Sequence, residues 1–220
     1  MSEKVTQPIA CPQCGKHTFF THWKTINVSE HPELKAKARS GELFTLFCPH
    51  CQCPSIIDTS FVYHDEDAKI LIHCADNQKG LQDALHLIEN DVGANPQSYR
   101  VRVVTSLPDF QEKLAIFESG FDDRIIELAK MMFAAQVQAQ GIKFDHIFFV
   151  QAAQGKEHAI QFFDSETGKS QGLWFNAQTK SVYSALEKQF AVLIKEHQRD
   201  ALINTSWAVK LINEMSAKAR

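Results

Sequence analysis

The sequence lacks any long apolar run and any block of charge of one sign. Apolar stretches such as 147–150 and 131–135 are far shorter than the about 20 residues of a membrane-spanning helix. The first ten residues, MSEKVTQPIA, contain no apolar segment of a secretory signal. The net charge is −3, with both signs mixed along the chain. We therefore expect a cytoplasmic protein with no membrane role, and bulk charge gives no support for nucleic-acid binding.

The common catalytic motifs give little support for an enzyme. The metalloprotease motif H-E-x-x-H is absent. The segment ETGKSQG at 166–172 has the end of a phosphate-binding loop, but such a loop needs a glycine at position 163, which is Phe163. We interpret 164–170 as a hairpin turn instead. Whether the chain is an enzyme stays uncertain, and the motifs favour a negative answer.

Six cysteines are present, and four of them form two C-x-x-C pairs. Cys11 and Cys14 lie in CPQCG, and Cys48 and Cys51 lie in CPHC. In a reducing compartment these cysteines should not form a disulfide framework. Two such pairs can complete the tetrahedral shell of one Zn²⁺ ion, each supplying half of the ligands.

Local sequence supports two cysteine-bearing turns. Pro12 presets the backbone for a turn, and Gly15 permits a left-handed conformation just after the second cysteine. Residues 17–28 alternate like a strand, whereas a redox C-x-x-C is expected at the start of a helix. A redox or disulfide role and unligated thiols remain the alternatives. Gln52, in place of a glycine, puts the tightness of the second turn in question.

The other potential ligands are interpreted as spares. Cys53 could replace Cys51, but its spacing does not match the first pair, so we expect it to pack. Cys74 ends an alternating segment and is expected to be a small core residue. Three histidines near the turns are not needed once four thiolates fill the shell: His17, His22 and His50. A four-cysteine shell leaves no open position for water, which predicts one structural Zn²⁺ and no catalytic metal.

Hydrophobic periodicity predicts an α+β protein. The first half should form an antiparallel sheet over about 5–105 with the zinc-ribbon-like four-cysteine clamp at one end. Its elements are a helix at 31–39, a hairpin of 55–64 with 68–75, a helix at 79–91 that stops near Gly93 and Pro96, and a strand at 99–106. Ser106 resembles a helix cap and Gly120 should separate two helices.

The C-terminal half should contain a second small antiparallel sheet and closing helices. Its strands are expected at 145–152, 158–165 and 172–177, and its helices at 179–197 and from Asn204. We predict a domain of residues 1–130 that contains the clamp, the first sheet and helices. Residues 131–220 are predicted to form an α+β extension packed on it.

Two polar clusters raise the question of acid–base chemistry. The segment YHDED at 63–67 falls at a predicted hairpin tip, where solvated polar residues are expected in any case. Asp122 and Asp123 precede Arg124 at a predicted helix start, where acids compensate the helix dipole. We therefore favour a turn for the first cluster and helix capping for the second, with catalysis as the alternative.

The order of these motifs resembles the CpXC protein family of bacteria and archaea. The resemblance covers about residues 8–130 and rests on the segments CPQCG, INVSEHPELKAKARSGELFTLFCPHC, YHDEDAKILIH and RVVTSLPDFQEKLAIFESGFDDRIIEL. It implies a zinc-binding domain without an assigned biochemical role, and its knuckle cysteines correspond to Cys11, Cys14, Cys48 and Cys51.

Three functional hypotheses follow. The first is a zinc-stabilised scaffold or interaction module that binds a protein partner or a small ligand. The second is a nucleic-acid-associated zinc ribbon, suggested by the cations and aromatics of 16–24. Residues 1–75 hold about as many acids as bases, which argues against it. An enzyme with a site between sheet and helices is the third.

Overall fold

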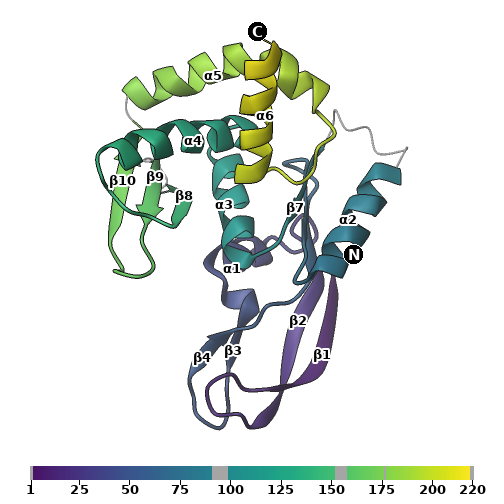
Figure 1. Cartoon of the computed structure of the whole chain (residues 1–220). Helices are drawn as coiled ribbons and strands as arrows, with labels where there is room; N and C mark the ends of the chain where they lie inside the picture. The colour runs from purple at the N-terminus through teal and green to yellow at the C-terminus, as the bar shows by residue number, and fades with distance from the viewer. Residues whose placement is uncertain (1, 91–98, 152–157, 176, 219–220) are drawn as a thin grey trace. The chain divides into compact units, whose positions relative to one another are not determined.

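The computed structural model describes residues 2–90, 99–151, 158–175 and 177–218. The chain divides into two compact units, Met1–Gln111 and Glu112–Arg220, and the division falls within helix α3, Leu107–Glu118. Figure 1 labels most of the elements of both units. The predicted α+β class is confirmed, with a five-stranded sheet, a separate three-stranded antiparallel sheet and a four-cysteine cluster.

Unit 1 is built on a five-stranded sheet in the order β1-β2-β5-β6-β7. Its strands are β1 Glu3–Ala10, β2 His17–Asn27, β5 Phe61–Asp65, β6 Ile70–Cys74 and β7 Arg100–Val104. The predicted hairpin of β5 and β6 is present and antiparallel. The sheet is mixed, however, because β2 pairs with β5 and β6 pairs with β7 in parallel. Helix α2, Gln78–Asn90, joins β6 to β7, and a helical crossover is the usual connection between parallel neighbours.

Two hairpins of unit 1 carry the paired cysteines, and we call them the cysteine hairpins. The first is β1 with β2, whose connection contains Cys11 and Cys14. The second is β3 Thr45–Phe47 with β4 Pro54–Ile56, whose connection contains Cys48 and Cys51. Helix α1, Glu33–Ser40, and the 3₁₀ turn η1, Glu42–Phe44, lie between them in sequence. Gly41 ends α1 with φ of 82°, a conformation that favours glycine.

An aromatic cluster fills the core of unit 1. Phe61 stacks on Phe44 with ring centroids 4.6 Å apart and meets Phe110 edge-on at 4.9 Å. Tyr63 also contacts Phe110, at 5.5 Å between centroids. All four side chains are buried. Since these residues come from η1, β5 and α3, the cluster ties the start of α3 to the sheet.

Unit 2 combines three helices with a small three-stranded sheet. The helices are α4 Asp123–Ala139, α5 Ala177–Glu196 and α6 Thr205–Lys218, and the strands are β8 His146–Gln151, β9 His158–Phe163 and β10 Ser170–Trp174. Its core is a cluster of apolar side chains that includes Leu128, Phe162, Phe190 and Trp207. Unit 2 therefore has a hydrophobic core of its own.

The predicted helix boundaries agree with the caps. The backbone N–H of Asp109 donates to Ser106 Oγ, and that of Trp207 donates to Asn204 Oδ1. Gly120 separates α3 from α4. The predicted stop near Gly93 and Pro96 lies outside the described residues. Within the described ranges, no helix combines the length and apolar character needed to cross a membrane.

Candidate metal centre

Each cysteine pair lies on a tight turn of the same geometry. The N–H of Gly15 donates to Cys11 O at 2.9 Å, and that of Gln52 donates to Cys48 O at 2.9 Å. Gly15 has φ of 70° and Gln52 has φ of 58°. The second turn therefore adopts the left-handed conformation although its residue is not glycine. Gln52 occupies the position that Gly15 has in the first turn. The second turn is equally tight, but its left-handed residue carries backbone strain that a glycine would avoid.

The two turns bring four sulfur atoms together. Cys11 Sγ lies 3.9 Å from Cys51 Sγ, and Cys14 Sγ lies 3.8 Å from Cys48 Sγ. All four Sγ atoms lie within 4.8 Å of one another. A tetrahedral zinc ion with Zn–S bonds of about 2.3 Å places its sulfurs about 3.8 Å apart. The six cysteines are free thiols, so the four sulfurs have the spacing of a coordination shell and not of disulfides.

The electrostatics of the cluster favour a bound cation. The backbone N–H of Cys51 and that of His50 help to lower the pKa of Cys48 to about 6, against the effect of burial. At Cys51 the backbone N–H of Cys53 lowers the pKa, but burial and the three other thiols outweigh it and raise the pKa to about 12. The Cys48 thiol thus ionises readily, whereas the Cys51 thiol does not. A divalent ion would supply the charge that lets all four lose their protons.

The remaining cysteines and histidines stand outside this shell. Cys53 is exposed, contrary to the packing expected for it, and its thiol lies 3.5 Å from Cys51 O. Cys74 is buried at the end of β6, as predicted. His50 is exposed and its Nε2 lies 3.2 Å from His17 O, which links the two turns. His22 is buried beside Phe20 on β2.

The two cysteine turns allow a matched test of backbone strain at Gly15 and Gln52. We expect Gly15→Ala to destabilise unit 1 by about 1 kcal/mol, because an added Cβ at positive φ is strained, although it would meet nothing within 4 Å. Gln52→Gly should stabilise it by a similar amount, about 0.5–1 kcal/mol. Urea unfolding of the metal-loaded protein measures both changes. Shifts of the same sign in the two variants would contradict the strain assigned to Gln52.

The segment YHDED does not form an acid–base site. Tyr63 and Asp65 are buried, and Asp65 pairs with Lys35 at 2.7 Å. His64 alternates with them along β5, and its Nε2 lies 3.2 Å from the hydroxyl of Tyr99. The expected turn follows at 66–69. The polar groups of this segment therefore serve separate contacts and do not converge.

The two aspartates before Arg124 differ in role. Asp122 caps α4, as predicted, because its side chain accepts from the N–H of Arg124. Asp123 is instead fully buried and lies 3.0 Å from Lys113 Nζ. It belongs to a set of five buried charged residues, which we call the charge cluster: Glu112, Lys113, Asp123, Glu127 and Lys130. Nothing in the sequence pattern indicated this cluster.

One further sequence motif contains Ser170. Residues 168–172, GKSQG, have the spacing of the nucleophile elbow of serine hydrolases. That elbow requires a strand, a sharp turn and then a helix. Here Ser170 follows a hairpin turn and begins strand β10. The motif therefore lacks the structural context of a catalytic serine.

Comparison with known proteins agrees with the four-cysteine arrangement. No curated protein and no solved structure matches the chain. The family model of the CpXC protein matches residues 9–130, which include both cysteine turns. The match covers more than half of the 220 residues, and the chain therefore belongs to the CpXC protein family.

Proposed function

We propose that the protein binds one structural Zn²⁺ ion through Cys11, Cys14, Cys48 and Cys51. The observation that carries the proposal is the approach of four thiol sulfurs to within 4.8 Å of one another. Four sulfur ligands suit Zn²⁺ better than Mg²⁺ or Ca²⁺, which prefer oxygen. A closed shell of protein ligands leaves no position for a substrate, so the metal serves structure and not catalysis.

The function that this arrangement supports best is that of an intracellular scaffold or interaction module. The metal fixes two hairpins whose outer faces expose large apolar side chains. Phe19 on β2 is 72% exposed, and Phe47 on β3 is 68% exposed. Exposed aromatic residues of this size are typical of surfaces that bind a partner. We favour a protein partner on these faces.

The nucleic-acid alternative has one observation in its favour. The exposed Phe19 and Phe47 could stack on bases, and residues 4–29 contain no acid. Two nearby lysines are already engaged, however. Lys4 lies over the ring of Trp23 at 4.3 Å, and Lys24 lies 3.8 Å from Glu3. Few cations remain for phosphates, so this alternative ranks second.

Metal analysis tests the zinc proposal. Protein purified without added metal should contain one zinc ion per chain by native and elemental mass spectrometry. The single variants Cys11→Ser and Cys48→Ser should lose most of the metal, because each removes one of four ligands. Cys53→Ser is the matched control and should keep it. Full zinc in a ligand variant, or another metal in the purified protein, would contradict the proposal.

A further inference from the structure

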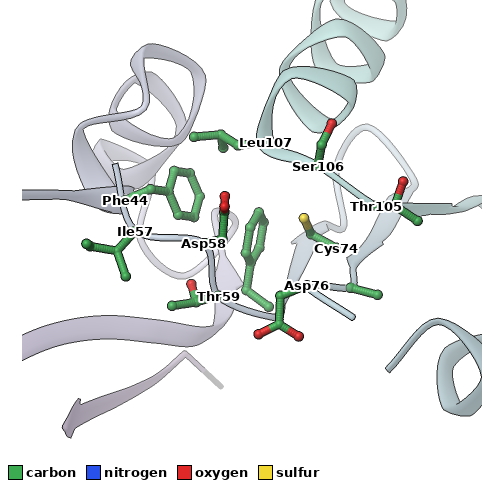
Figure 2. A pocket seen from close by; sticks show the side chains of 11 residues that line it. Phe44, Ile57, Asp58, Thr59, Cys74, Asp76, Thr105, Ser106 and Leu107 are labelled. Atoms are coloured by element: carbon green, nitrogen blue, oxygen red, sulfur yellow. The ribbon is translucent and has the colours of Figure 1, made fainter. Parts of the chain in front are cut away.

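A second candidate site lies in unit 1, away from the four cysteines. It is a pocket of about 100 Å³, which has room for several water molecules or a ligand of a few heavy atoms. Its walls come from η1, the segment 57–61, the end of β6 and the segment 105–107. None of Cys11, Cys14, Cys48 and Cys51 lines it. Figure 2 shows the side chains that surround this space.

The pocket lies at the carboxyl ends of two parallel strands. Strands β6 and β7 end at Cys74 and Val104, and the residues that follow them line the pocket. Ligands of α/β sheets bind characteristically at this edge, outside the carboxyl ends of parallel strands. The helices that begin here are already capped, because Asn77 accepts from Gly80 N and Ser106 accepts from Asp109 N. Their free N–H groups are thus partly used and do not favour an anion.

Negative charge dominates the pocket. Figure 2 shows the carboxylate of Asp58 pointing into the space bordered by Phe44, Leu107 and Cys74. Within the described part of the chain, Asp58 has no hydrogen bond or ion pair. Asp76 points away from this space in the same view and accepts from Ser60 at 2.6 Å. Asp58 therefore offers its carboxylate to a ligand.

The pKa of the Cys74 thiol reflects its burial and the carboxylates around the pocket. Burial raises its pKa to about 12, and the carboxylates of Asp109, Asp58 and Asp76 contribute to the increase. The thiol is therefore neutral at pH 7 and is not a nucleophile. The same carboxylates that disfavour a thiolate in this position favour a cation.

The other walls of the pocket supply an apolar surface. Phe44, Phe61 and Leu107 line the pocket and are largely buried by the surrounding core. Thr59 also lines the pocket, but its Oγ1 is enclosed by protein atoms and is not open to a ligand.

We propose that this pocket binds a small organic cation, a primary ammonium on a short apolar chain. The ammonium group would pair with the Asp58 carboxylate, the one polar group that points into the space bordered by Phe44, Leu107 and Cys74 in Figure 2. The apolar chain would contact Phe44 and Leu107. Aromatic rings beside a carboxylate are well suited to such cations, since both the charge and the ring face attract them. The proposal is independent of the metal held by the cysteines.

A titration with defined probes tests the pocket. Propylammonium chloride is added to ¹⁵N-labelled, metal-loaded protein, with 1-propanol and sodium chloride as matched neutral and ionic controls. We expect the backbone amides of Thr59, Asp76 and Ser106 to shift saturably with a Kd of about 1 mM, as suits a ligand of four heavy atoms. Neither control should reproduce these shifts at the same concentration.

Two variants make the test specific. Asp58→Asn should weaken propylammonium binding at least about tenfold, and Asp67→Asn should leave it unchanged, because Asp67 is an exposed acid in the turn after β5. An otherwise unchanged amide spectrum shows that the Asp58→Asn protein is folded. Equal binding of 1-propanol, equal binding by Asp58→Asn, or tighter binding of magnesium chloride at the same amides would overturn the proposal.

Discussion

Removal of zinc from the loaded protein is expected to unfold the two cysteine hairpins and to leave unit 2 folded. Strands β3 and β4 contain three residues each, and an isolated two-stranded hairpin is marginal in water. Structural zinc contributes about 10–16 kcal/mol in comparable peptides, which is comparable to the about 5–15 kcal/mol stability of a typical domain. Unit 2 keeps its own core, which contains none of these cysteines.

Hydrogen exchange, followed segment by segment, tests this expectation. After chelation, amides of 3–27 and 45–56 should lose their protection, while those of α4, α5 and α6 should keep theirs. The pair Cys51→Ser and Cys53→Ser supplies a matched comparison two residues apart, since only Cys51 belongs to the sulfur cluster. Cys51→Ser should behave like the chelated protein and Cys53→Ser like the loaded one. Retained protection of both hairpins without metal would show that packing alone holds them.

The sulfur cluster could be predicted from sequence because its determinants are local. Each C-x-x-C turn is specified within five residues, through Pro12 and Gly15 in the first and the same spacing in the second. A tetrahedral ion then requires the two halves to meet. The helix caps at Ser106 and Asn204 were predictable for the same reason, because an N-cap side chain binds a backbone N–H two or three residues away.

Features that depend on distant partners were not predictable in this way. The parallel pairing of β2 with β5 joins residues about forty apart, and strand alternation carries no information on direction. The pocket of Asp58 has walls from four separate segments. Charged residues on a helix are normally solvated, so nothing in the sequence of α3 and α4 distinguished Lys113 and Lys130 from surface lysines. Only the packing of the two helices shows that both are buried.

The charge cluster of unit 2 contains close ion pairs between buried side chains. Lys130 Nζ lies 2.9 Å from Glu112 and 3.2 Å from Glu127, and Lys113 Nζ lies 3.0 Å from Asp123. These side chains are at most 6% exposed. Burial lowers the pKa of Lys113 and Lys130, whereas the neighbouring carboxylates raise it. The carboxylates have the larger effect, so the pKa of both lysines is raised above its ordinary value. Burial raises the pKa of Glu112, and the Glu127 carboxylate adds to the increase, while Lys130 and Lys113 oppose it.

Lys130→Met is expected to destabilise unit 2 strongly. Removal of one partner from a buried ion pair leaves uncompensated charge and typically costs about 3–5 kcal/mol. Glu112 would lose its ammonium partner while its carboxylate still accepts from the N–H of Phe149 on β8. Chemical denaturation followed by a probe in unit 2 measures the change in unfolding free energy. Lys218→Met is the control, because Lys218 pairs with Glu196 at 2.7 Å on the surface and its loss should have a much smaller effect.

The double variant Glu112→Gln with Lys130→Met separates unpaired charge from lost packing. Glutamine keeps an acceptor oxygen for the N–H of Phe149 and removes the negative charge that Lys130 neutralises. If uncompensated charge causes the loss, the double variant should recover at least half of it, even though it carries one more substitution. If the double variant is as unstable as Lys130→Met or more so, the loss arises from packing around the lysine. In that case the charges at the α3–α4 contact would not account for the stability of unit 2.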